Sequence, residues 1–343
     1  MEPAQPPLHG VSAVVLNYNG GQMVLDCVTS LVAQQPPCDE IVCVDNASTD
    51  GSADAVEAGF PQVKVVRLAS NRGFAGGMNR AISQTSGALV GLINLDVVLA
   101  PDYLARCARA LDQDARLGGV TGKLLRPDNV DPPILDTTGH SVYRNRRAVD
   151  RGEREPDLGQ YDSDTGLFSI CGAAPVLRRE MLNDVALDGE YFDEDFFAYF
   201  EDFDLCWRAQ LRGWGFAYVP GAVGRHFRGG SEGKASTFVL SCNHRNRLFV
   251  MLHNDSPASF LRHLPGIAYT EVRATLHMLG LRPAALIRAW ADFFRLLPRQ
   301  LVKRRRIQAR RTVGWQALER WFQPYDYRVG TVLRRARQRA AVR

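Results

Sequence analysis

Several common sequence patterns are missing from this chain of 343 residues. No run of about 18 uncharged apolar residues occurs, so we expect no membrane-spanning helix. The N-terminal segment MEPAQPPLHG has neither a basic region nor an apolar region, so we expect no secretory signal peptide. The seven cysteines form no CxxC pair and no regular spacing, which argues against a zinc site and against a disulfide scaffold. These absences favour a cytoplasmic protein in a reducing compartment.

Two widespread nucleotide-binding motifs are also missing. After the first apolar run the chain reads NYNGG in place of GxGxxG, which disfavours the dinucleotide fold of dehydrogenases. No GxxxxGK followed by Ser or Thr occurs, which disfavours a P-loop nucleotidase. The sequence therefore argues against both of these nucleotide-binding classes.

Charged residues are unevenly distributed. Hydrophobic residues make up 45% and charged residues 23% of the chain, values that are typical of a folded protein and exclude wholesale disorder. Residues 261–343 carry 19 Lys and Arg against 4 Asp and Glu, a net charge of +15, whereas residues 1–260 carry a net charge of −10. A basic C-terminal segment on an acidic body indicates an anionic partner, either a membrane surface or a nucleic acid.

The first third of the chain alternates short apolar runs with segments of helical periodicity. The apolar runs cover residues 11–16, 40–44, 63–68 and 88–94, and the helical segments cover 23–34, part of 48–59, 74–87 and 101–114. Strands that are apolar almost throughout indicate a parallel sheet covered on both faces. We therefore predict an α/β fold with a mostly parallel central sheet, helices on both faces and a basic helical extension at the C-terminus.

The middle of the chain is less regular. Residues 126–166 predict a long connection with a short hairpin near 134–149, and residues 166–180 predict two strands joined by a glycine turn. DFDLCWRAQLRG predicts a helix that ends at Gly213, and GFAYVP predicts a strand. From about residue 240 the pattern is helical and basic.

Polar residues follow each predicted strand, where ligands of such sheets bind. They are Asn17, Tyr18, Asn19, Asp45, Asn46, Asn71, Gly73, Asn94 and Asp96. Asp45 can accept hydrogen bonds from a base or a ribose, whereas Ser48 and Asp50 fit ligand contact and capping of the next helix about equally. Asp96 ends a very apolar strand and suits a hard divalent cation that also takes phosphate oxygens, although a strand-end turn residue is the alternative.

The segment FDEDFFAYFEDFD places six carboxylates among aromatic residues. Burial and mutual repulsion should raise the pKa of one or more of them and produce a general base. In the alternative interpretation, Asp202 caps the next helix, and the negative charge of Asp204 stabilises the first turn of that helix. His226 is a lone histidine, more often structural than a ligand, but Arg225 and Arg228 beside it would suit a diphosphate.

These motifs, in this order, resemble the family 2 glycosyltransferases with the GT-A fold, and within them the bacterial rhamnosyltransferase-like branch. The resemblance runs from about residue 11 to about residue 255. It rests on VVLNYNG, VDNASTDGS, NRGFAGGMNRAI, NLDVVL, YFEDFDLCWRAQLRGW, RHFRGGSEG and RNRLF. The chain departs from the family at Asn94, which replaces the first Asp of the metal-binding Asp-x-Asp, whereas the last one is present as Asp96.

The resemblance implies an inverting transferase that uses a nucleoside-diphosphate sugar and Mg²⁺ or Mn²⁺. It implies Asp202 as the base with Glu201 beside it, Asp96 and His226 at the metal, and Gly172 and Ala173 at the acceptor. The implied donor-nucleotide residues are Asn17, Tyr18, Asn19, Asp45, Asn46, Ser48, Asn71, Gly73, Asn79 and Asn94. The branch suggests dTDP-L-rhamnose as donor and a cell-surface glycan or lipid-linked acceptor, with UDP-sugars left open.

The same resemblance predicts the organisation of the chain. We expect a disordered segment over residues 1–10, a catalytic domain over 11–255 and a helical basic extension over 256–343. Within the catalytic domain, residues 11–125 would bind the nucleotide and residues 126–255 the acceptor. 

Two other classes remain open on sequence grounds. A nucleotidyltransferase shares strand-end carboxylates, but NYNGG lacks a basic residue for a triphosphate. The segments KRRRIQARR and RRARQRAAVR suggest a nucleic-acid-binding protein, but the acidic body argues against one, so no nucleic acid is expected.

The basic segment also has a membrane interpretation. Leu286, Trp290, Phe293, Phe294, Leu297 and Leu301 form one helical stripe, with Arg288, Arg295 and Arg299 off it. Such a helix can lie in a membrane interface, and packing of the stripe as ordinary core is the alternative. The membrane interpretation predicts a peripheral protein on the inner face of the cell membrane.

Overall fold

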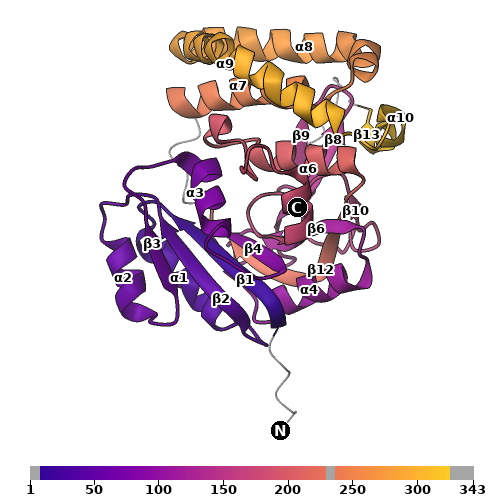
Figure 1. Ribbon diagram of the computed structural model, residues 1–343. Coiled ribbons are helices and arrows are strands. Elements are labelled where there is room, and N and C mark those ends of the chain that lie inside the picture. Colours follow the sequence, from indigo (N-terminus) through magenta and orange to yellow (C-terminus); the bar gives the residue numbers. More distant parts are fainter. Residues whose placement is uncertain (1–7, 229–235, 325–343) are drawn as a thin grey trace.

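The structure is a computed structural model that describes residues 8–228 and 236–324 (Figure 1). Its centre is a ten-stranded sheet with the strand order β10-β12-β6-β11-β4-β1-β2-β3, in which β5 pairs with β12 and β7 with β6. Strands β1 (Leu8–Asn17), β2 (Cys38–Asp45), β3 (Lys64–Arg67) and β4 (Leu89–Asn94) are mutually parallel. The predicted α/β architecture with a mostly parallel sheet is confirmed.

The other half of the sheet is mixed. It contains β5 (Val97–Leu99), β6 (Leu117–Leu125), β7 (Leu135–Thr137), β10 (Gly166–Leu167), β11 (Pro175–Arg178) and β12 (Gly215–His226). Strand β11 runs antiparallel to both β4 and β6, whereas β6 and β12 are parallel. This arrangement places the ends of β4 and β12 near each other, because β5, which directly follows β4, pairs with the end of β12.

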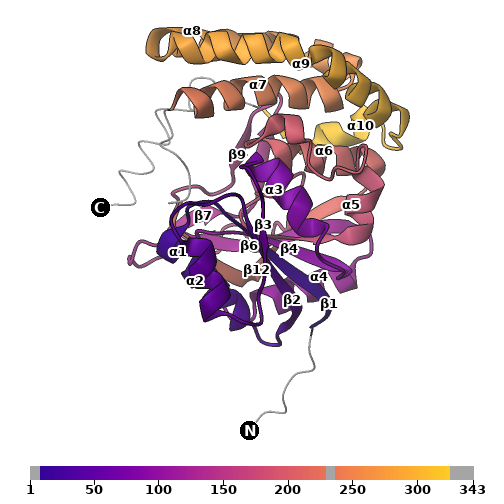
Figure 2. The same cartoon turned by 60° about the vertical axis from the view of Figure 1, so that its left-hand side comes forward.

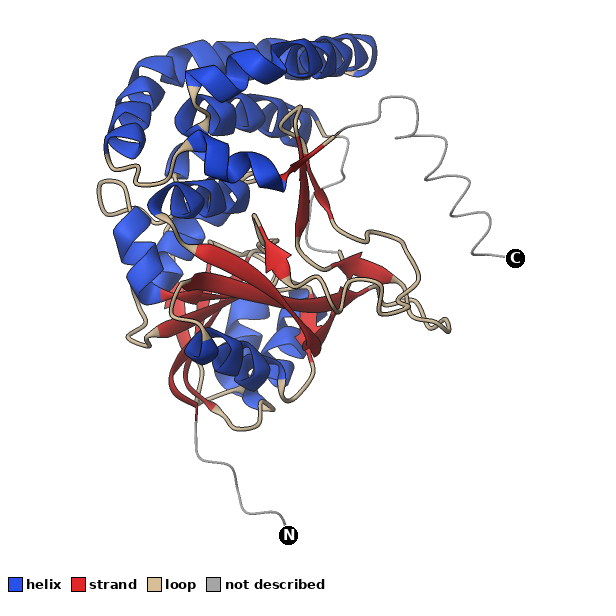
Figure 3. Ribbon diagram, turned by 90° about the vertical axis from the view of Figure 1, so that its right-hand side faces the viewer, coloured by secondary structure: helices blue, strands red, loops and turns tan. Residues whose placement is uncertain are grey.

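Helices cover both faces of the sheet, as Figure 3 shows. On one face α1 (Gly21–Val32), α2 (Ser52–Gly59) and α4 (Tyr103–Gln113) pack against Val11, Ala13 and Val15. On the other face α3 (Gly73–Ile82), α5 (Arg179–Val185) and α6 (Glu201–Arg212) pack against Val14 and Leu16. The alternation of β1 side chains between two apolar cores explains why this strand is apolar along its whole length.

A small second sheet and a layer of helices complete the fold. The predicted hairpin is present as β8 (His140–Tyr143) and β9 (Ala148–Asp150), and β13 (Phe322–Gln323) joins β8. Helices α7 (Thr237–Asn254), α8 (Pro257–Leu281) and α9 (Pro283–Ala309) lie together at the end of the molecule away from the N-terminus (Figures 1 and 2). The short α10 (Trp315–Leu318) and η2 (Glu319–Trp321) follow, and η1 (Glu194–Phe196) precedes α6.

Two sequence predictions need correction here. Residues 8–10, predicted to be disordered, form the beginning of β1, and Leu8 pairs with Cys38; residues 1–7 lie outside the described part. The apolar stripe of α9 is not one free surface, because Leu286 is buried and Phe293 stacks on Phe249 of α7, whereas Phe294 is 63% exposed. The core interpretation therefore holds for much of this stripe. The segment RRARQRAAVR lies outside the described residues.

Candidate active site

The predicted donor residues meet at the carboxyl edge of β1 and β2. Asn17 is fully buried, and its Nδ2 donates to Ser52 Oγ at 2.9 Å and, more weakly, to Asp45 Oδ1 and Ser48 Oγ at 3.3 Å each. Ser48 Oγ also accepts the backbone N–H of Asn19 at 3.0 Å. Asn17 thus ties the loop after β1 to the loop after β2. Tyr18 is 42% exposed at this edge, where its ring is open to a ligand.

The capping alternative for this loop is wrong for Ser48. The residue that precedes α2 is Gly51, which has a left-handed φ of 77° and offers no side-chain cap. Asp45 is buried, and among residues 8–228 and 236–324 it accepts only long contacts, of 3.3 Å, from Asn17 and from the Ser48 backbone N–H. A carboxylate has capacity for about four hydrogen bonds, so Asp45 retains acceptor capacity for a base or ribose.

The third predicted loop is fastened to the second by amide contacts. Asn46 Nδ2 donates to Asn71 Oδ1 at 3.0 Å and to the Gly73 carbonyl at 3.1 Å, and Asn46 Oδ1 accepts the Arg72 N–H. Gly73 has a φ of 69°, and an added Cβ would lie 2.4 Å from the Phe197 carbonyl oxygen. Only glycine allows the start of α3 to approach the segment before α6 this closely.

The structure gives Asn79 a specific position that the sequence did not indicate. Its Oδ1 accepts the backbone N–H groups of Tyr191 and Phe192, and its Nδ2 donates to the Phe192 carbonyl and to Glu194. The amide of Asn79 is therefore engaged in holding residues 191–194 on α3. Contact of Asn79 with the nucleotide stays a prediction without support from these contacts.

The predicted metal residues Asp96 and His226 lie together, one after β4 and one at the end of β12. His226 Nε2 is 3.3 Å from Asp96 Oδ1, and His226 Nδ1 is 2.7 Å from Asp136 Oδ2. Burial acts to lower the pKa of His226, but its hydrogen bonds to Asp136 and Asp96 prevail and raise it to about 9. Asp136 thus contacts one ring nitrogen of His226, and the second ring nitrogen is directed at Asp96. Metal-binding histidines usually have a carboxylate on one ring nitrogen in this way.

These residues fit a divalent cation. Asp96 and His226 supply a carboxylate and an imidazole, and the buried Oδ1 of Asn94 has no hydrogen-bond partner within the described residues. A neutral amide oxygen in this position can accept from a ligand or contact a cation. Asp96 and His226 would hold the ion, with Asn94 at its edge, and the remaining positions would be left for diphosphate oxygens.

Sequence reasoning missed Asp136. It is fully buried on β7 and contacts both His226 and, through Oδ1 at 2.6 Å, Arg228 Nε. Burial acts to raise the pKa of Asp136, but hydrogen bonds from His226 and Arg228 hold it below its usual value. Asp136 lies in a stretch that the sequence assigned to a long connection, and a lone Asp there carries no motif that could reveal its role.

The predicted base residues Glu201 and Asp202 form the first turn of α6 but differ in environment. Glu201 is 7% exposed, and burial, followed by the negative charge of Asp202, raises its pKa to about 8. Asp202 is more accessible, and its Oδ2 accepts the Gly172 backbone N–H at 2.8 Å. Asp202 is not the N-cap residue of α6, which is Phe200, but its Oδ1 accepts the Phe203 backbone N–H of the first turn at 2.7 Å. Asp204, in contrast, pairs with Arg208 within the first turns of the helix.

The predicted acceptor residues join the two carboxylate sites. Gly172 contacts Asp202, and the neighbouring Ala173 carbonyl accepts the Asn94 backbone N–H at 2.8 Å. A Cβ on Gly172 would lie 3.2 Å from Asp202 Oδ2, so the small residue keeps this carboxylate in place. The loop of residues 171–174 therefore links the end of β4, next to the metal residues, with the candidate base.

The segment before α6 has an unusual backbone. Phe197, Tyr199 and Phe200 all have positive φ values, of 64°, 74° and 69°. Each such residue costs about 1–2 kcal/mol, so the surroundings have to stabilise it. Asn246 of α7 is fully buried, and its Nδ2 donates to the carbonyls of residues 196, 198 and 199 at 2.8–2.9 Å. This side chain, within the RNRLF motif, holds the segment that leads into Glu201 and Asp202.

Substitution Asn246→Ala should therefore destabilise the protein by about 1–3 kcal/mol, because buried carbonyls lose their donor. It should also lower the rate of sugar transfer, because the strained segment can relax. Thermal unfolding and the turnover rate measure the two effects. Asn243→Ala is the matched control, since Asn243 Nδ2 donates to the Val239 carbonyl of its own helix at 2.8 Å. Equal effects of the two substitutions would contradict this role for Asn246.

Comparison with known proteins identifies the family of this chain. Residues 12–185 match the family described as Glycosyl transferase family 2, which is half of the chain. Among curated proteins, the chain is 28% identical over 257 residues to N-acetylglucosaminyl-diphospho-decaprenol L-rhamnosyltransferase of Mycobacterium tuberculosis (strain CDC 1551 / Oshkosh), covering 68% of this chain and 81% of the relative. It is 24% identical over 220 residues to poly-beta-1,6-N-acetyl-D-glucosamine synthase of Staphylococcus epidermidis, covering 63% and 49%.

Solved structures with the same fold include a mannosyltransferase and S. aureus TarS. Mannosyltransferase PcManGT from Pyrobaculum calidifontis, in complex with GDP-Man and Mn²⁺, aligns with a TM-score of 0.52 and 19% identity over 89% of each chain. S. aureus TarS 1-349 in complex with UDP aligns with a TM-score of 0.54 and 18% identity over 88% of this chain and 87% of TarS. At these identities the alignments establish the fold alone.

The fold is of the GT-A type. The chain belongs to glycosyltransferase family 2, and its relatives include a rhamnosyltransferase and polysaccharide synthases. It is therefore an enzyme of the class that transfers sugars from nucleotide-sugar donors.

Proposed function

We propose that this protein is an inverting glycosyltransferase that moves L-rhamnose from a nucleoside diphosphate to a hydroxyl group of a lipid-linked or cell-surface glycan. The observation that carries the proposal is the loop of residues 171–174. Its Gly172 N–H holds the candidate base Asp202, and its Ala173 carbonyl holds the end of β4 beside Asp96. A donor phosphate at Asp96 and an acceptor hydroxyl at Asp202 would thus lie on the two sides of one short loop.

The donor residues have separate tasks in this proposal. Asp45 and Tyr18 contact the nucleoside, while Asn17, Asn19, Asn46, Ser48, Asn71 and Gly73 shape and fasten the loops around it. Asp96 and His226 hold Mg²⁺ or Mn²⁺ against the diphosphate, with Asn94 next to them. A bound divalent cation supplies positive charge that stabilises the departing diphosphate.

Asp202 acts as the general base. It removes the proton of the acceptor hydroxyl while that oxygen attacks the sugar carbon from the face opposite the diphosphate, so the anomeric configuration inverts. Burial and the negative charge of Asp202 raise the pKa of Glu201, which favours its neutral form beside Asp202. Asp202, the more accessible of the two, is the proton acceptor of the pair in this proposal.

The rhamnose donor and the lipid-linked acceptor are the finer parts of the proposal. They are supported by the resemblance to the rhamnosyltransferase-like branch of the family. They are also supported by the name of the Mycobacterium tuberculosis relative, N-acetylglucosaminyl-diphospho-decaprenol L-rhamnosyltransferase. Thermal shifts with UDP-, dTDP- and GDP-sugars, each with Mn²⁺, test the donor. Stabilisation confined to dTDP-L-rhamnose supports the proposal, and stabilisation confined to UDP- or GDP-sugars contradicts this donor.

We also propose that the protein binds a membrane surface, on the cytoplasmic side, through α8. Leu261, Leu264, Val272, Leu276 and Leu279 are each 39–64% exposed. Their spacing of three, four or eight residues places them on one helical face, opposite the buried Ile267 and Met278. No helix of the described residues combines the length and the low charge required to cross a bilayer. This exposed face is broader than the part of the predicted α9 stripe that remains free.

Charge favours an anionic lipid surface as the occupant of this face. Arg262 and Arg273 are exposed beside the apolar stripe, whereas the acidic Glu271 is largely buried and paired with Arg247. On α9, Asp292 is similarly paired with Arg295. An apolar face flanked by exposed arginines is typical of helices that lie in the interface of an anionic bilayer.

Substitution of Val272 and Leu276 by Glu should abolish flotation with liposomes that contain anionic lipid. The two carboxylates would oppose both burial in the acyl boundary and the attraction to anionic headgroups. Leu158→Glu is the control, because Leu158 is 75% exposed on a different part of the molecule. Flotation of the double variant at wild-type levels would contradict membrane binding through α8. Concentration-dependent dimers that the double substitution abolishes, without flotation of the wild type, would assign the face to a second copy of the chain instead.

A further inference from the structure

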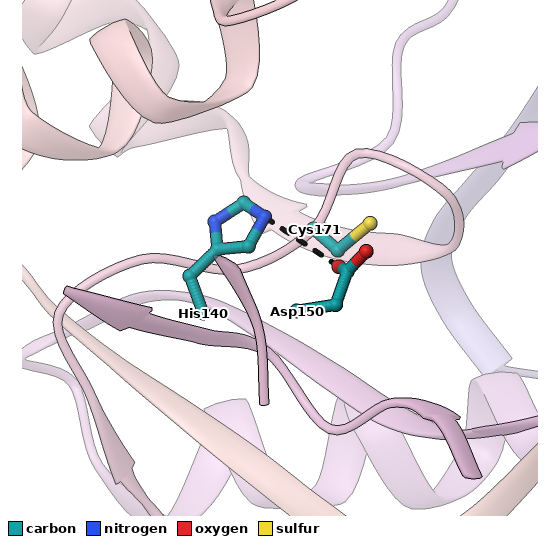
Figure 4. A group of neighbouring side chains, drawn as sticks. All are labelled: His140, Asp150 and Cys171. Carbon is teal, nitrogen blue, oxygen red and sulfur yellow. Dashed lines mark ion pairs between the residues drawn. The ribbon is translucent and has the colours of Figure 1, made fainter. Parts of the chain in front are cut away.

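One side-chain cluster next to the candidate base has no role in the proposed transfer. It consists of His140 at the start of β8, Asp150 at the end of β9 and Cys171 in the loop that leads to Gly172 (Figure 4). One ligand atom from each residue lies within 4.8 Å of the other two. Among the residues that the structure describes, no other group of three His, Cys, Asp or Glu side chains meets this condition.

The contacts around the cluster orient its atoms for a ligand. His140 Nδ1 is 2.8 Å from Ser169 Oγ, and its Nε2 faces Asp150 Oδ1 at 3.9 Å. Asp150 Oδ2 accepts Arg228 Nη2 at 2.7 Å, whereas the buried Asp150 Oδ1 has no hydrogen-bond partner in the part of the chain that the structure describes. His140 and Asp150 therefore each use one polar atom for a contact with a neighbouring side chain and direct the other polar atom into the cluster. Contacts of this kind orient the side chains that bind metal ions in proteins.

We propose that His140, Asp150 and Cys171 bind Zn²⁺ and that the bound ion inhibits sugar transfer. A sulfur, an imidazole nitrogen and a carboxylate oxygen form a donor set that Zn²⁺ prefers, unlike the hard ions Mg²⁺ and Mn²⁺. Zinc–ligand distances of about 2.0–2.3 Å place tetrahedral ligand atoms roughly 3.5 Å apart, so the site requires the side chains to close by about 1 Å. The absence of a CxxC pair argues against a four-cysteine site but not against this mixed site.

Binding of the ion has a defined chemical balance. Burial, together with the negative charges of Asp150 and Asp202, raises the pKa of Cys171, so the free site holds a thiol. Zn²⁺ forms a bond to the sulfur and the thiol proton leaves to solvent, with no change in oxidation state. Three protein ligands leave a fourth position for water.

Inhibition follows from the position of Cys171 and rests on the proposed function of Asp202. Cys171 directly precedes Gly172, whose N–H donates to Asp202 at 2.8 Å. A divalent cation on Cys171 would lie one residue from the N–H that holds Asp202, at the loop where the acceptor hydroxyl is proposed to bind. The ion and its water also occupy space on the acceptor side of the loop.

Cobalt provides a test of the site that does not depend on activity. Full-length protein freed of metal and titrated with Co²⁺ should develop thiolate-to-cobalt charge-transfer absorption that saturates at one equivalent and disappears when Zn²⁺ is added. The isosteric Cys171→Ser should remove this absorption, and His140→Ala should weaken binding at least tenfold. Cys38→Ser and Asp96→Ala should keep the absorption, since neither residue belongs to the cluster.

The inhibition is measured separately. Zn²⁺ added to wild-type protein at saturating Mn²⁺ should stop transfer, and Cys171→Ser should require at least tenfold more Zn²⁺. No charge-transfer absorption, or absorption that survives Cys171→Ser, overturns the zinc site even if the wild type proves inactive as a transferase. Absorption that depends on Cys171 without inhibition of an active wild type overturns the inhibitory role.

Discussion

Asp202→Asn is expected to lower sugar transfer by about 10²–10⁴-fold, the usual contribution of a general base. The amide cannot accept the acceptor proton, and its single oxygen can accept only one of the two backbone N–H groups, of Gly172 and Phe203, that the Asp202 carboxylate accepts at 2.8 and 2.7 Å. Donor binding should therefore stay close to the wild-type value, and the thermal stability should fall by about the 1–3 kcal/mol of one lost acceptor. Turnover with a nucleotide-sugar donor and calorimetric titration of the donor measure the two properties.

The controls for this substitution come from other carboxylates. Asp188→Asn removes an exposed carboxylate that pairs with Arg306 and should keep wild-type turnover. Glu201→Gln should reduce turnover less than Asp202→Asn, because burial and the charge of Asp202 raise the pKa of Glu201 and so favour the neutral form that glutamine mimics. Near-normal turnover of Asp202→Asn would refute the assignment of the base.

Asp96→Ala is expected to weaken Mn²⁺-dependent binding of a nucleoside diphosphate by at least tenfold and to leave binding of the free nucleoside nearly unchanged. Asp96 contacts His226 at the proposed ion, whereas the nucleoside is assigned to Asp45 and Tyr18. Calorimetric titrations with dTDP and with thymidine, each with and without Mn²⁺, separate the two effects. The replacement of an acidic residue by Asn94 makes Asp96 the main negative charge offered to the ion at this strand end.

Asp128→Ala is the matched control, because Asp128 is an exposed carboxylate that pairs with Arg126. It should bind dTDP like the wild type. Full activity of the wild-type protein in excess chelator would contradict the metal role of Asp96.

The parallel half of the sheet could be predicted from the sequence because its strands have a clear local pattern. The runs that became β1, β2, β3 and β4 are apolar and alternate with helical periodicity. Strand β6 was missed because it contains three glycines, which are unusual in a strand. The structure explains them by close packing: a Cβ on Gly119 would lie 2.5 Å from Leu177, and one on Gly122 would lie 2.2 Å from the Ala222 carbonyl oxygen. Such contacts between distant segments leave no periodic pattern.

The candidate site was predictable where a residue stands in an ordered motif. Asp96 and His226 were placed in one site from motifs 130 residues apart, and they lie 3.3 Å apart. Asp136 and Asn246 act through contacts with segments far away in the sequence, so local patterns could not reveal those contacts. The role of Asn79 in holding residues 191–194 was hidden for the same reason.

The C-terminal helices show the limit of periodicity as a guide to exposure. The spacing in α9 correctly grouped its apolar residues, but only tertiary packing decides which of them remain free. Leu286 and Phe293 face α7, and Lys303 is buried against Asp193 and Asp195. The more exposed apolar face belongs to α8. Its stripe is interrupted by Pro265 and Gly266, and it was not predicted from the sequence.

The anomeric configuration of the transferred sugar tests the proposed mechanism most directly. Wild-type protein, Mn²⁺ and dTDP-L-rhamnose would be incubated with a polyprenyl-diphosphate-linked N-acetylglucosamine, and the product examined by NMR spectroscopy. The mechanism predicts a glycosidic bond of the configuration opposite to that of the donor, with one dTDP released for each bond formed. A product that retains the donor's configuration would contradict it, because base-assisted attack from the face opposite the diphosphate can only invert the sugar carbon.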